Sequence, residues 1–271
     1  MKILNGKELA GFIKERQAHQ VRALRQAWQL EPKLAIVVTV DNPVIDVYMR
    51  MKQKYGADIL VDVEVHRISQ SEAESTITEL NDDPTVTGII VQLPLEDPAQ
   101  TDHIVNLVAP EKDVDALGKD ALFDPATPMA ILWLLAGYNV DLRGKKVLLV
   151  GRGKLVGGPL EQMLLASDID VSVADRSTDD LAAAVKEADV IITATGTPGV
   201  IRSDMVKQGA VVVDAGVAGE KGKTVGDVDD DIYNREDIIL APSKGGVGPL
   251  TVCALFDNVI RAARIVAEQK Q

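Results

Sequence analysis

Short apolar runs rich in β-branched residues, separated by helical patterns, constrain the fold of this chain more than any other feature. Strands are expected at residues 33–40 (KLAIVVTV), 63–68 and 86–93 (VTGIIVQL). Helical patterns fill the intervals 43–56 and 71–81. Strands that are apolar on both faces and alternate with helices are typical of a parallel sheet covered by helices.

The same alternation starts again after about residue 120. Further strands are expected at 145–150, 169–174, 189–194, 210–215 and 237–241. One helix is expected to end at about 166, and others at 178–187 and about 250–268. We therefore predict two α/β domains with a cleft between them, the C-terminal one Rossmann-like with a parallel sheet. Residues 1–120, with a long amphipathic helix at 6–30, form the first domain and are completed by a helix within 250–271. Residues 121–249 form the second.

Composition excludes several functional classes. The formal net charge is −12, which argues against a protein that binds the phosphate backbone of nucleic acids. With one cysteine and three scattered histidines, neither an intrachain disulfide nor a metal cluster is expected. The sequence has no apolar signal region and no stretch of about 18 apolar residues. We therefore expect a cytoplasmic protein without metal, nucleic-acid or membrane partners.

A glycine-rich turn follows the strand at 145–150. Gly151, Arg152, Gly153, Val156 and Gly157 form a GxGxxxG pattern that opens a helix. Glycines let the backbone approach a pyrophosphate closely, and the helix N-terminus stabilises its charge. The spacing differs from the common GxGxxG, so the flanking strand and helix carry much of the prediction of a dinucleotide site. A glycine-rich loop without a ligand is the alternative.

Charged residues after the next strand bear on the choice of dinucleotide. Asp175 follows Gly151 by about 24 residues, where a carboxylate would bind the ribose hydroxyls of NAD. Arg152 and Arg176 would instead attract the 2′-phosphate of NADP, which Asp175 would repel. We predict NADP as the cofactor, with NAD as the alternative. The remaining predicted cofactor residues are Ser177, Thr195, Gly196, Gly216 and Val217.

The helix at 43–56 carries the candidate catalytic pair of the first domain, Tyr48 and Lys52. At ~100° per residue, its apolar stripe is predicted to comprise Val44, Val47, Tyr48, Met51 and Tyr55. Lys52 lies at the margin of this stripe beside Tyr48, where a lysine ordinarily reaches into water. A lysine that is partly desolvated there would have a lowered pKa and would serve as an acid or base.

Two other polar residues belong to the same domain. Gln92 ends the third strand at the carboxyl edge of the sheet, where ligands bind in open α/β folds. It could orient a lysine amine or a substrate amide, or be an ordinary residue at a strand end. Asp115 lies in the charged loop 112–116, for which a solvated turn is the default interpretation.

Eight motifs occur in register along the chain. They are YxxxK at 48–52 after DNP, VQLPL at 91–95, KDVDAL at 112–117, PATP at 125–128, GRxxxVGxP at 151–159, ATGxPG at 194–199, VGDV at 225–228 and GGVGPLT at 245–251. Together they resemble the bifunctional methylenetetrahydrofolate dehydrogenase/methenyltetrahydrofolate cyclohydrolase family. Each motif is modest alone, whereas eight in register are highly specific.

The resemblance implies NAD(P)-dependent oxidation of 5,10-methylenetetrahydrofolate to the methenyl form, followed by hydrolysis to 10-formyltetrahydrofolate. It implies that Lys52 is the acid/base of the hydrolysis, that Gln92 holds its amine, and that Tyr48 packs against the folate. Asp115 would accept hydrogen bonds from the amino-pyrimidine edge of the pterin. The implied substrate-binding set also includes Leu93, Gly248, Pro249 and Thr251. A homodimer is implied as well.

The sequence departs from the family pattern around the cofactor. The usual serine after Gly-Arg is Gly153, and the usual His-Ser pair is Asp175-Arg176. The usual Gly-Ile-Asn reads Gly216-Val217-Ala218, and Ser243-Lys244 precede the last glycine motif. These changes bear on cofactor preference more than on folate chemistry.

Three alternatives accompany this interpretation. Short-chain dehydrogenases also use a YxxxK pair, but their glycine-rich turn comes first, whereas Tyr48 and Lys52 precede Gly151 by about a hundred residues. A non-catalytic folate or nucleotide binder of the same fold would have no need of an acid/base lysine. A family member that retains only one of the two activities is the third alternative.

Overall fold

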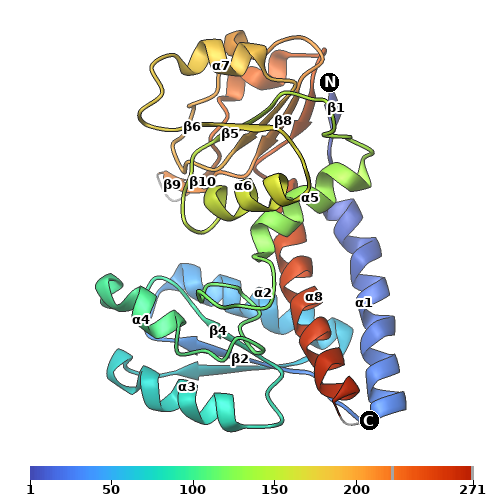
Figure 1. Cartoon of the computed structure of the whole chain (residues 1–271), viewed down its shortest axis with the longest axis vertical. Helices are drawn as coiled ribbons and strands as arrows, with labels where there is room; N and C mark the ends of the chain where they lie inside the picture. Colours follow the sequence, from blue (N-terminus) through green and yellow to red (C-terminus); the bar gives the residue numbers. More distant parts are fainter. Residues whose placement is uncertain (221–222, 270–271) are drawn as a thin grey trace. The chain divides into compact units, whose positions relative to one another are not determined.

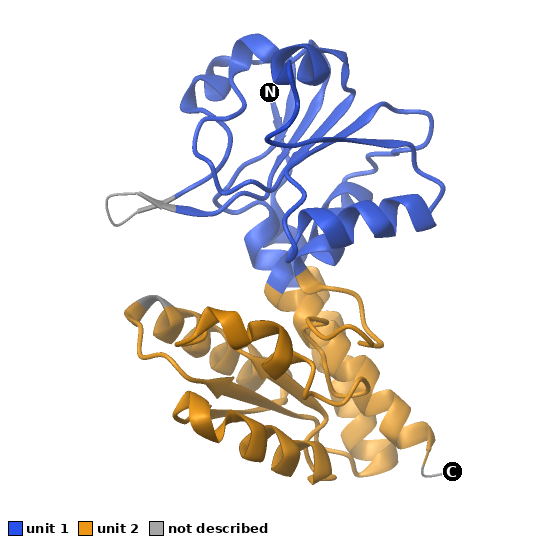
Figure 2. Ribbon diagram, turned by 60° about the vertical axis from the view of Figure 1, so that its left-hand side comes forward, with its two compact units in different colours: residues 1–11, 127–251 blue, residues 12–126, 252–271 orange. Residues whose placement is uncertain are grey.

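The computed structural model describes residues 1–220 and 223–269, which divide into two compact units (Figure 2). Unit 1 comprises residues 1–11 and 127–251, and unit 2 comprises residues 12–126 and 252–271. Each unit is built on a parallel sheet with helical connections, which confirms the predicted α/β class.

The sheet of unit 2 has three parallel strands in the order β3–β2–β4. Their bounds are Lys33–Val38 for β2, Asp62–Arg67 for β3 and Gly88–Val91 for β4. The connecting helices are α2 (Pro43–Ile59) and α3 (Ala73–Asp82), followed by the short α4 (Thr101–Val105). Helices α3 and α4 cover one face of the sheet, and α2 lies on the other side (Figure 1). The continuous apolar runs of β2 and β4 therefore correspond to strands that are covered on both faces, whereas the residues of β3 are only partly buried or exposed.

Two long helices, α1 (Gly6–Trp28) and α8 (Val247–Glu268), begin in unit 1, and their remaining residues, from 12 in α1 and from 252 in α8, complete unit 2. The buried Gln17 of α1 donates from Nε2 to the carbonyl oxygen of Cys253 in α8 at 2.8 Å. Its Oε1 accepts a hydrogen bond from the Tyr55 hydroxyl of α2 at 2.7 Å. One amide thus joins three helices. No helix in the described part of the chain has the length and apolar character needed to cross a membrane.

The sheet of unit 1 has six parallel strands in the order β1–β11–β8–β7–β5–β6. The strands are β1 (Lys2–Ile3), β5 (Val147–Val150), β6 (Val171–Ala174), β7 (Val190–Thr193), β8 (Val211–Asp214) and β11 (Ile239–Ala241). An antiparallel hairpin is formed by β9 (Ala218–Glu220) and β10 (Lys223–Val225). The strand β1 and the hairpin were not predicted from the sequence.

The helices of unit 1 are α5 (Ala126–Gly137), α6 (Gly157–Ala166) and α7 (Leu181–Glu187). Helix α7 packs through Val185 on a sheet face that includes Leu148, Ile191 and Val212. Helix α5 was not predicted, because its residues are apolar on all sides and show no helical period. Short 3₁₀ helices occur at Gln70–Glu72, Pro98–Gln100, Ser203–Met205 and Asp230–Asn234.

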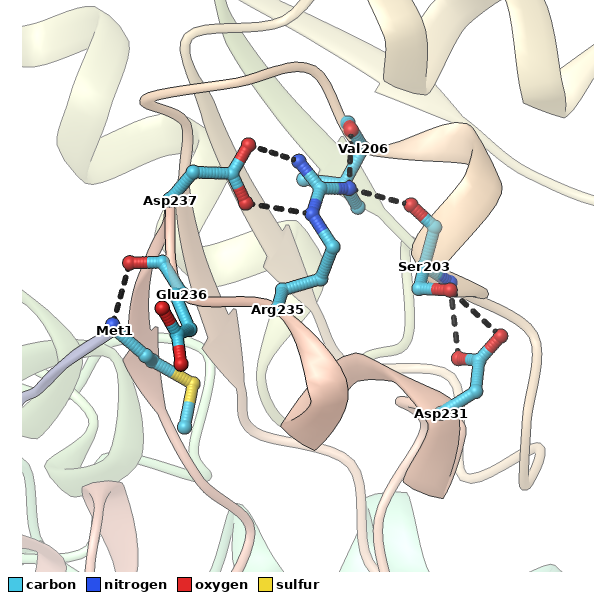
Figure 3. Close-up of polar contacts among 7 residues, drawn as sticks. All are labelled: Met1, Ser203, Val206, Asp231, Arg235, Glu236 and Asp237. Carbon is cyan, nitrogen blue, oxygen red and sulfur yellow. Dashed lines mark hydrogen bonds and ion pairs between the residues drawn. The ribbon is translucent and has the colours of Figure 1, made fainter.

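Arg235 joins two loops of unit 1 (Figure 3). Its Nε and Nη2 donate to the Asp237 carboxylate at 2.7 and 2.8 Å. Its Nη1 donates to the carbonyl oxygens of Ser203 and Val206 at 2.7 and 2.8 Å. The guanidinium therefore satisfies backbone acceptors of the loop before β8 while it pairs with the segment that leads into β11.

Candidate active site

The apolar stripe predicted for α2 is wrong. Val47, Tyr48 and Met51 are 50%, 42% and 46% exposed, and Tyr55 is partly buried. The side chain of Val44 lies outside the described part of the structure. The helix thus leaves a strip of apolar side chains in contact with solvent.

The buried face of α2 instead carries Lys52. It runs through Ile45, Met49, Lys52, Gly56 and Ile59, of which Lys52 is partly exposed and the others are buried. Gly56 accounts for this orientation, because a Cβ there would lie 2.5 Å from the Val63 side chain and 2.8 Å from the Val61 carbonyl oxygen. Because α2 approaches β3 closely at Gly56, the residues on the same side of α2 as Gly56 face the core.

Lys52 reaches the end of β4. Its Nζ donates a hydrogen bond to Gln92 Oε1 at 2.9 Å. Gln92 is held on two sides, since its backbone N–H donates to Val37 at 2.9 Å and its Nε2 donates to the Leu93 carbonyl oxygen at 2.8 Å. The amide therefore presents its acceptor oxygen to the lysine.

Burial changes the proton affinity of two groups at this site. It lowers the pKa of Lys52, and the charge of Asp115 partly opposes the shift. It raises the pKa of Asp115, and the charge of Lys52 opposes that shift. Both directions follow from the lost hydration of the charged forms. Lys52 therefore releases its proton more readily than a surface lysine, which suits an acid/base.

The loop 112–117 is not a solvated turn. The Nζ of Lys112 donates at 3.0, 2.7 and 2.7 Å to three carbonyl oxygens at the end of α3, those of Leu80, Asn81 and Asp83. The buried Asp113 accepts from the Gly118 N–H at 2.7 Å. Lys112 and Asp113 thus shape the loop, while the charge of Asp115 interacts with Lys52.

The other predicted substrate residues are distributed over both units. Tyr48 is one helical turn before Lys52 in unit 2, and Leu93 packs partly buried against the core beneath β4. Gly248, Pro249 and Thr251 lie in the first turns of α8 and belong to unit 1. Within unit 2 the structure brings together Lys52, Gln92 and Asp115.

The glycine-rich turn of unit 1 borders a cavity of 820 Å³. Its lining includes seven predicted cofactor residues, Gly151, Arg152, Gly153, Asp175, Arg176, Ser177 and Thr195. Gly151 has a φ of +96°, and a Cβ there would lie 2.8 Å from the Ala194 carbonyl oxygen. A Cβ on Gly157 would lie 2.0 Å from the Gly151 carbonyl oxygen. Both positions therefore require glycine, and the bare backbone at the start of α6 fits a pyrophosphate.

Other residues of this region differ from the predicted set. Val156, Gly157, Gly196, Gly216 and Val217 do not line this cavity. Seven lining residues were not predicted: Val150, Ala174, Thr178, Leu181, Ala194, Thr197 and Val200. The Thr178 hydroxyl accepts a hydrogen bond from the Asp175 N–H at 3.0 Å. A threonine three residues after Asp175, at the end of a strand, is the sequence signal that could have identified it.

Three of the cavity's charged groups are held by neighbours or exposed. Asp175 Oδ1 accepts from the N–H and hydroxyl of Ser177 at 2.8 and 2.6 Å, which lowers the pKa of Asp175. Arg152 makes a two-point ion pair with Glu161, at 2.6 and 2.8 Å. Arg176 is exposed. All of these residues except Glu161 belong to the set predicted from the sequence.

A buried carboxylate holds the loop on the far wall of the cavity. Asp227, fully buried, accepts from the N–H groups of Thr195 and Thr197 at 2.6 and 3.0 Å. Asp214 at the end of β8 in turn accepts from the Asp227 N–H at 3.0 Å. A Cβ on Gly216 would lie 2.0 Å from Asp227. The VGDV motif contains this residue, but its role could not be read without the fold.

Comparisons with known proteins cover both units. The family model described as "tetrahydrofolate dehydrogenase/cyclohydrolase, catalytic domain" matches residues 4–115, and the corresponding "NAD(P)-binding domain" model matches residues 125–267. A bifunctional protein FolD of Moorella thermoacetica is 38% identical over 277 residues, which span 97% of this chain and 98% of that protein.

Solved structures are also similar to this chain. The bifunctional enzyme FolD, methylenetetrahydrofolate dehydrogenase/cyclohydrolase, of Campylobacter jejuni matches with a TM-score of 0.91 and 35% identity, over 98% of this chain and 99% of that one. The N5,N10-methylenetetrahydrofolate dehydrogenase-cyclohydrolase of Trypanosoma brucei, complexed with NADP cofactor and an inhibitor, matches with a TM-score of 0.89 and 28% identity, over 96% of each chain.

Proposed function

Because this chain belongs to the tetrahydrofolate dehydrogenase/cyclohydrolase family, we propose that it catalyses two successive steps of one-carbon folate chemistry. It oxidises 5,10-methylenetetrahydrofolate to 5,10-methenyltetrahydrofolate with NAD(P), and it hydrolyses the product to 10-formyltetrahydrofolate. The observation that carries the proposal is the hydrogen bond between Lys52 and Gln92, which gives unit 2 a desolvated acid/base in a chain whose unit 1 has a dinucleotide cradle.

Lys52 moves the proton in the hydrolysis. Uncharged Lys52 takes a proton from the water that adds to the methenyl carbon, and the resulting ammonium protonates the nitrogen released when the ring C–N bond breaks. The overall reaction consumes one water and releases one proton. Gln92 orients the amine without adding a charge, so the lowered pKa of Lys52 is preserved.

Asp115 and Tyr48 bind the folate in this proposal. Asp115 accepts hydrogen bonds from the amino-pyrimidine edge of the pterin, and a ligand with two N–H donors would repay the hydration that its carboxylate loses on burial. Tyr48, with the exposed Val47 and Met51, offers an apolar surface one turn from Lys52. Leu93, Gly248, Pro249 and Thr251 complete the substrate-binding set.

NADP is the proposed cofactor, with NAD as the alternative. The backbone of Gly151 and Gly157 and the start of α6 would hold the pyrophosphate, and Asp175, Arg176 and Ser177 would face the adenosine ribose. The loop carrying Thr195 and Gly196, and the segment carrying Gly216 and Val217, would border the nicotinamide. When bound, the nicotinamide ring accepts the hydride.

The proposal extends to the organisation and surroundings of the protein. Residues 1–120 with 250–271 serve folate chemistry, and residues 121–249 serve the dinucleotide, except that Gly248 and Pro249 contribute to the substrate-binding set. The enzyme works as a cytoplasmic homodimer on tetrahydrofolate derivatives. The net charge of −12 fits an enzyme that binds neither nucleic acid nor anionic membrane surfaces.

Purified protein supplied with methylenetetrahydrofolate and either nicotinamide dinucleotide tests the proposal. We expect reduced cofactor to form at a rate that depends on the dinucleotide, and added methenyltetrahydrofolate to lose its absorbance without any dinucleotide. Hydrolysis without oxidation, or the reverse, would identify a monofunctional member. Binding of both ligands with neither reaction would identify a non-catalytic binder.

A further inference from the structure

We infer that Glu161 sets the balance between the two nicotinamide dinucleotides by neutralising Arg152, so that the site favours the 2′-phosphate less than its two arginines indicate. The inference rests on the proposed function only in assigning the cavity beside Gly151 to a dinucleotide. It concerns a specificity-determining residue that does not itself line the cavity.

The geometry of the pair supports this role. Arg152 Nε donates to Glu161 Oε2 at 2.6 Å, and Arg152 Nη2 donates to Oε1 at 2.8 Å. The Glu161 side chain is 11% exposed, whereas that of Arg152 is 56% exposed and lines the cavity. A carboxylate behind the cavity wall therefore holds one edge of a guanidinium that faces the ligand space.

Glu161 depends on this arginine. Within the described residues, Arg152 is the only side chain that makes a hydrogen bond or ion pair with the Glu161 carboxylate. A carboxylate that is nearly excluded from water must keep its partner, because an unpaired charge loses its hydration without compensation. Arg152 consequently remains paired when a ligand arrives, and part of its hydrogen-bonding capacity is already used.

The effect of this ion pair on ligand binding depends on the other charges of the cavity. Asp175 holds a negative charge at neutral pH, since its hydrogen bonds with Ser177 favour the ionised form. Arg176 makes no ion pair with any residue that the structure describes. With Glu161 ionised, the two arginines and two carboxylates sum to zero. Without the Glu161 charge the sum is +1.

A ribose 2′-phosphate carries more than one negative charge near neutral pH, whereas the ribose of NAD carries none at this position. Both dinucleotides carry the negatively charged pyrophosphate, so the net charge of the cavity wall acts on both, but it acts more strongly on NADP because only NADP has the additional 2′-phosphate. Glu161 removes one positive charge from the site and so lowers the affinity for NADP relative to NAD. Arg176 then provides the unpaired positive charge for a 2′-phosphate.

The variant Glu161→Gln removes the charge with little change in shape. Calorimetry with the full chain should show the ratio of the NAD to the NADP dissociation constant rise about threefold to tenfold, chiefly through tighter NADP binding. The ratio of kcat/KM values for the two dinucleotides should follow, and hydrolysis of methenyltetrahydrofolate should stay unchanged. A merely structural role for Glu161 would weaken both dinucleotides together.

Glu187→Gln is the matched control. Glu187 is also ion-paired, with Lys146 at 3.1 Å, and it lies on α7 outside the lining of the dinucleotide cavity. This variant should leave the ratio of dissociation constants within about twofold of the parent protein, since exposed ion pairs contribute little.

An unchanged or lowered ratio in Glu161→Gln would overturn the inference, and a lowered one would mean that Glu161 orients Arg152 toward the phosphate. If Glu161→Gln does not fold, the double variant Arg152→Gln/Glu161→Gln removes both charges and should keep the parent ratio within about threefold. A loss of NADP preference of tenfold or more there would also overturn it. Because binding is measured directly, the result is independent of whether the proposed reactions occur.

Discussion

The two candidate sites hold their charged side chains in opposite ways. In unit 2, Lys52 is desolvated and bonded to the neutral amide of Gln92, so burial governs its protonation. In unit 1, Arg152 and Arg176 are exposed at the cavity wall, and Arg152 is matched by a carboxylate of opposite charge. The first site is arranged to transfer a proton, and the second to distinguish ligands by their charge. Variants should therefore separate the two activities.

The largest expected effect is on hydrolysis. Lys52→Met removes the acid/base and should slow methenyltetrahydrofolate hydrolysis about 10²–10⁴-fold, while hydride transfer is largely retained. Stopped-flow absorbance of the methenyl form measures this step. Lys54→Met, an exposed lysine two positions along α2, is the control and should leave both activities intact. Equal and mild losses of both activities in Lys52→Met would contradict the assignment.

Changing the partner of Lys52 should move its pKa. Hydrolysis should increase with pH as Lys52 loses its proton, with a midpoint below the ordinary lysine value of about 10.4. A carboxylate in Gln92→Glu favours the ammonium form, so the midpoint should move upward and the rate at pH 7 should fall at least tenfold. Gln53→Glu puts the same charge at an exposed position of α2 and serves as the control. An unmoved midpoint would show that Lys52 is not the titrating base.

The loop held by Asp227 should matter only for the dinucleotide. Asp227→Asn replaces one acceptor for the N–H groups of Thr195 and Thr197 with a donor, at a cost of about 1–3 kcal/mol. Dinucleotide affinity should fall about tenfold, with hydrolysis of added methenyltetrahydrofolate unaffected. Asp230→Asn, at an exposed acidic residue nearby, is the control. Parallel loss of both activities would indicate general destabilisation instead.

A change in ionic strength should distinguish the two sites by the smallest effect. Because the charges of the unit 1 cavity are exposed, raising the salt concentration from about 0.05 to 0.5 M should weaken NADP binding a few-fold more than NAD binding. The rate of hydrolysis at saturating substrate should change less than about twofold, since Lys52 is partly buried and its partner Gln92 is uncharged. Equal salt dependence of the two dinucleotides would argue against recognition of a 2′-phosphate by charge.

Local patterns predicted much of the fold, but they did not predict helix α5 and they gave the wrong buried face for helix α2. The strands and the glycine turn were found because β-branched runs and glycine reflect local backbone preferences. Helix α5 has no polar face and therefore no period to detect. In α2 the apolar residues Val47, Tyr48 and Met51 were assigned to the core, but the close packing of Gly56 against Val63 decided which face turns inward.

The sequence by itself determined two α/β units, a dinucleotide cradle at Gly151 and a set of polar residues worth testing, because these depend on composition and spacing over short stretches. The tertiary structure alone decided which groups meet. It joins Lys52 to Gln92 across 40 residues and Thr195 to Asp227 across 32. It also pairs Leu4 with Leu240 through a backbone hydrogen bond of 2.8 Å, so the first residues of the chain belong to the sheet of unit 1. Arg152 and Glu161 are only nine positions apart, but their ion pair forms only because the chain turns into α6 between them.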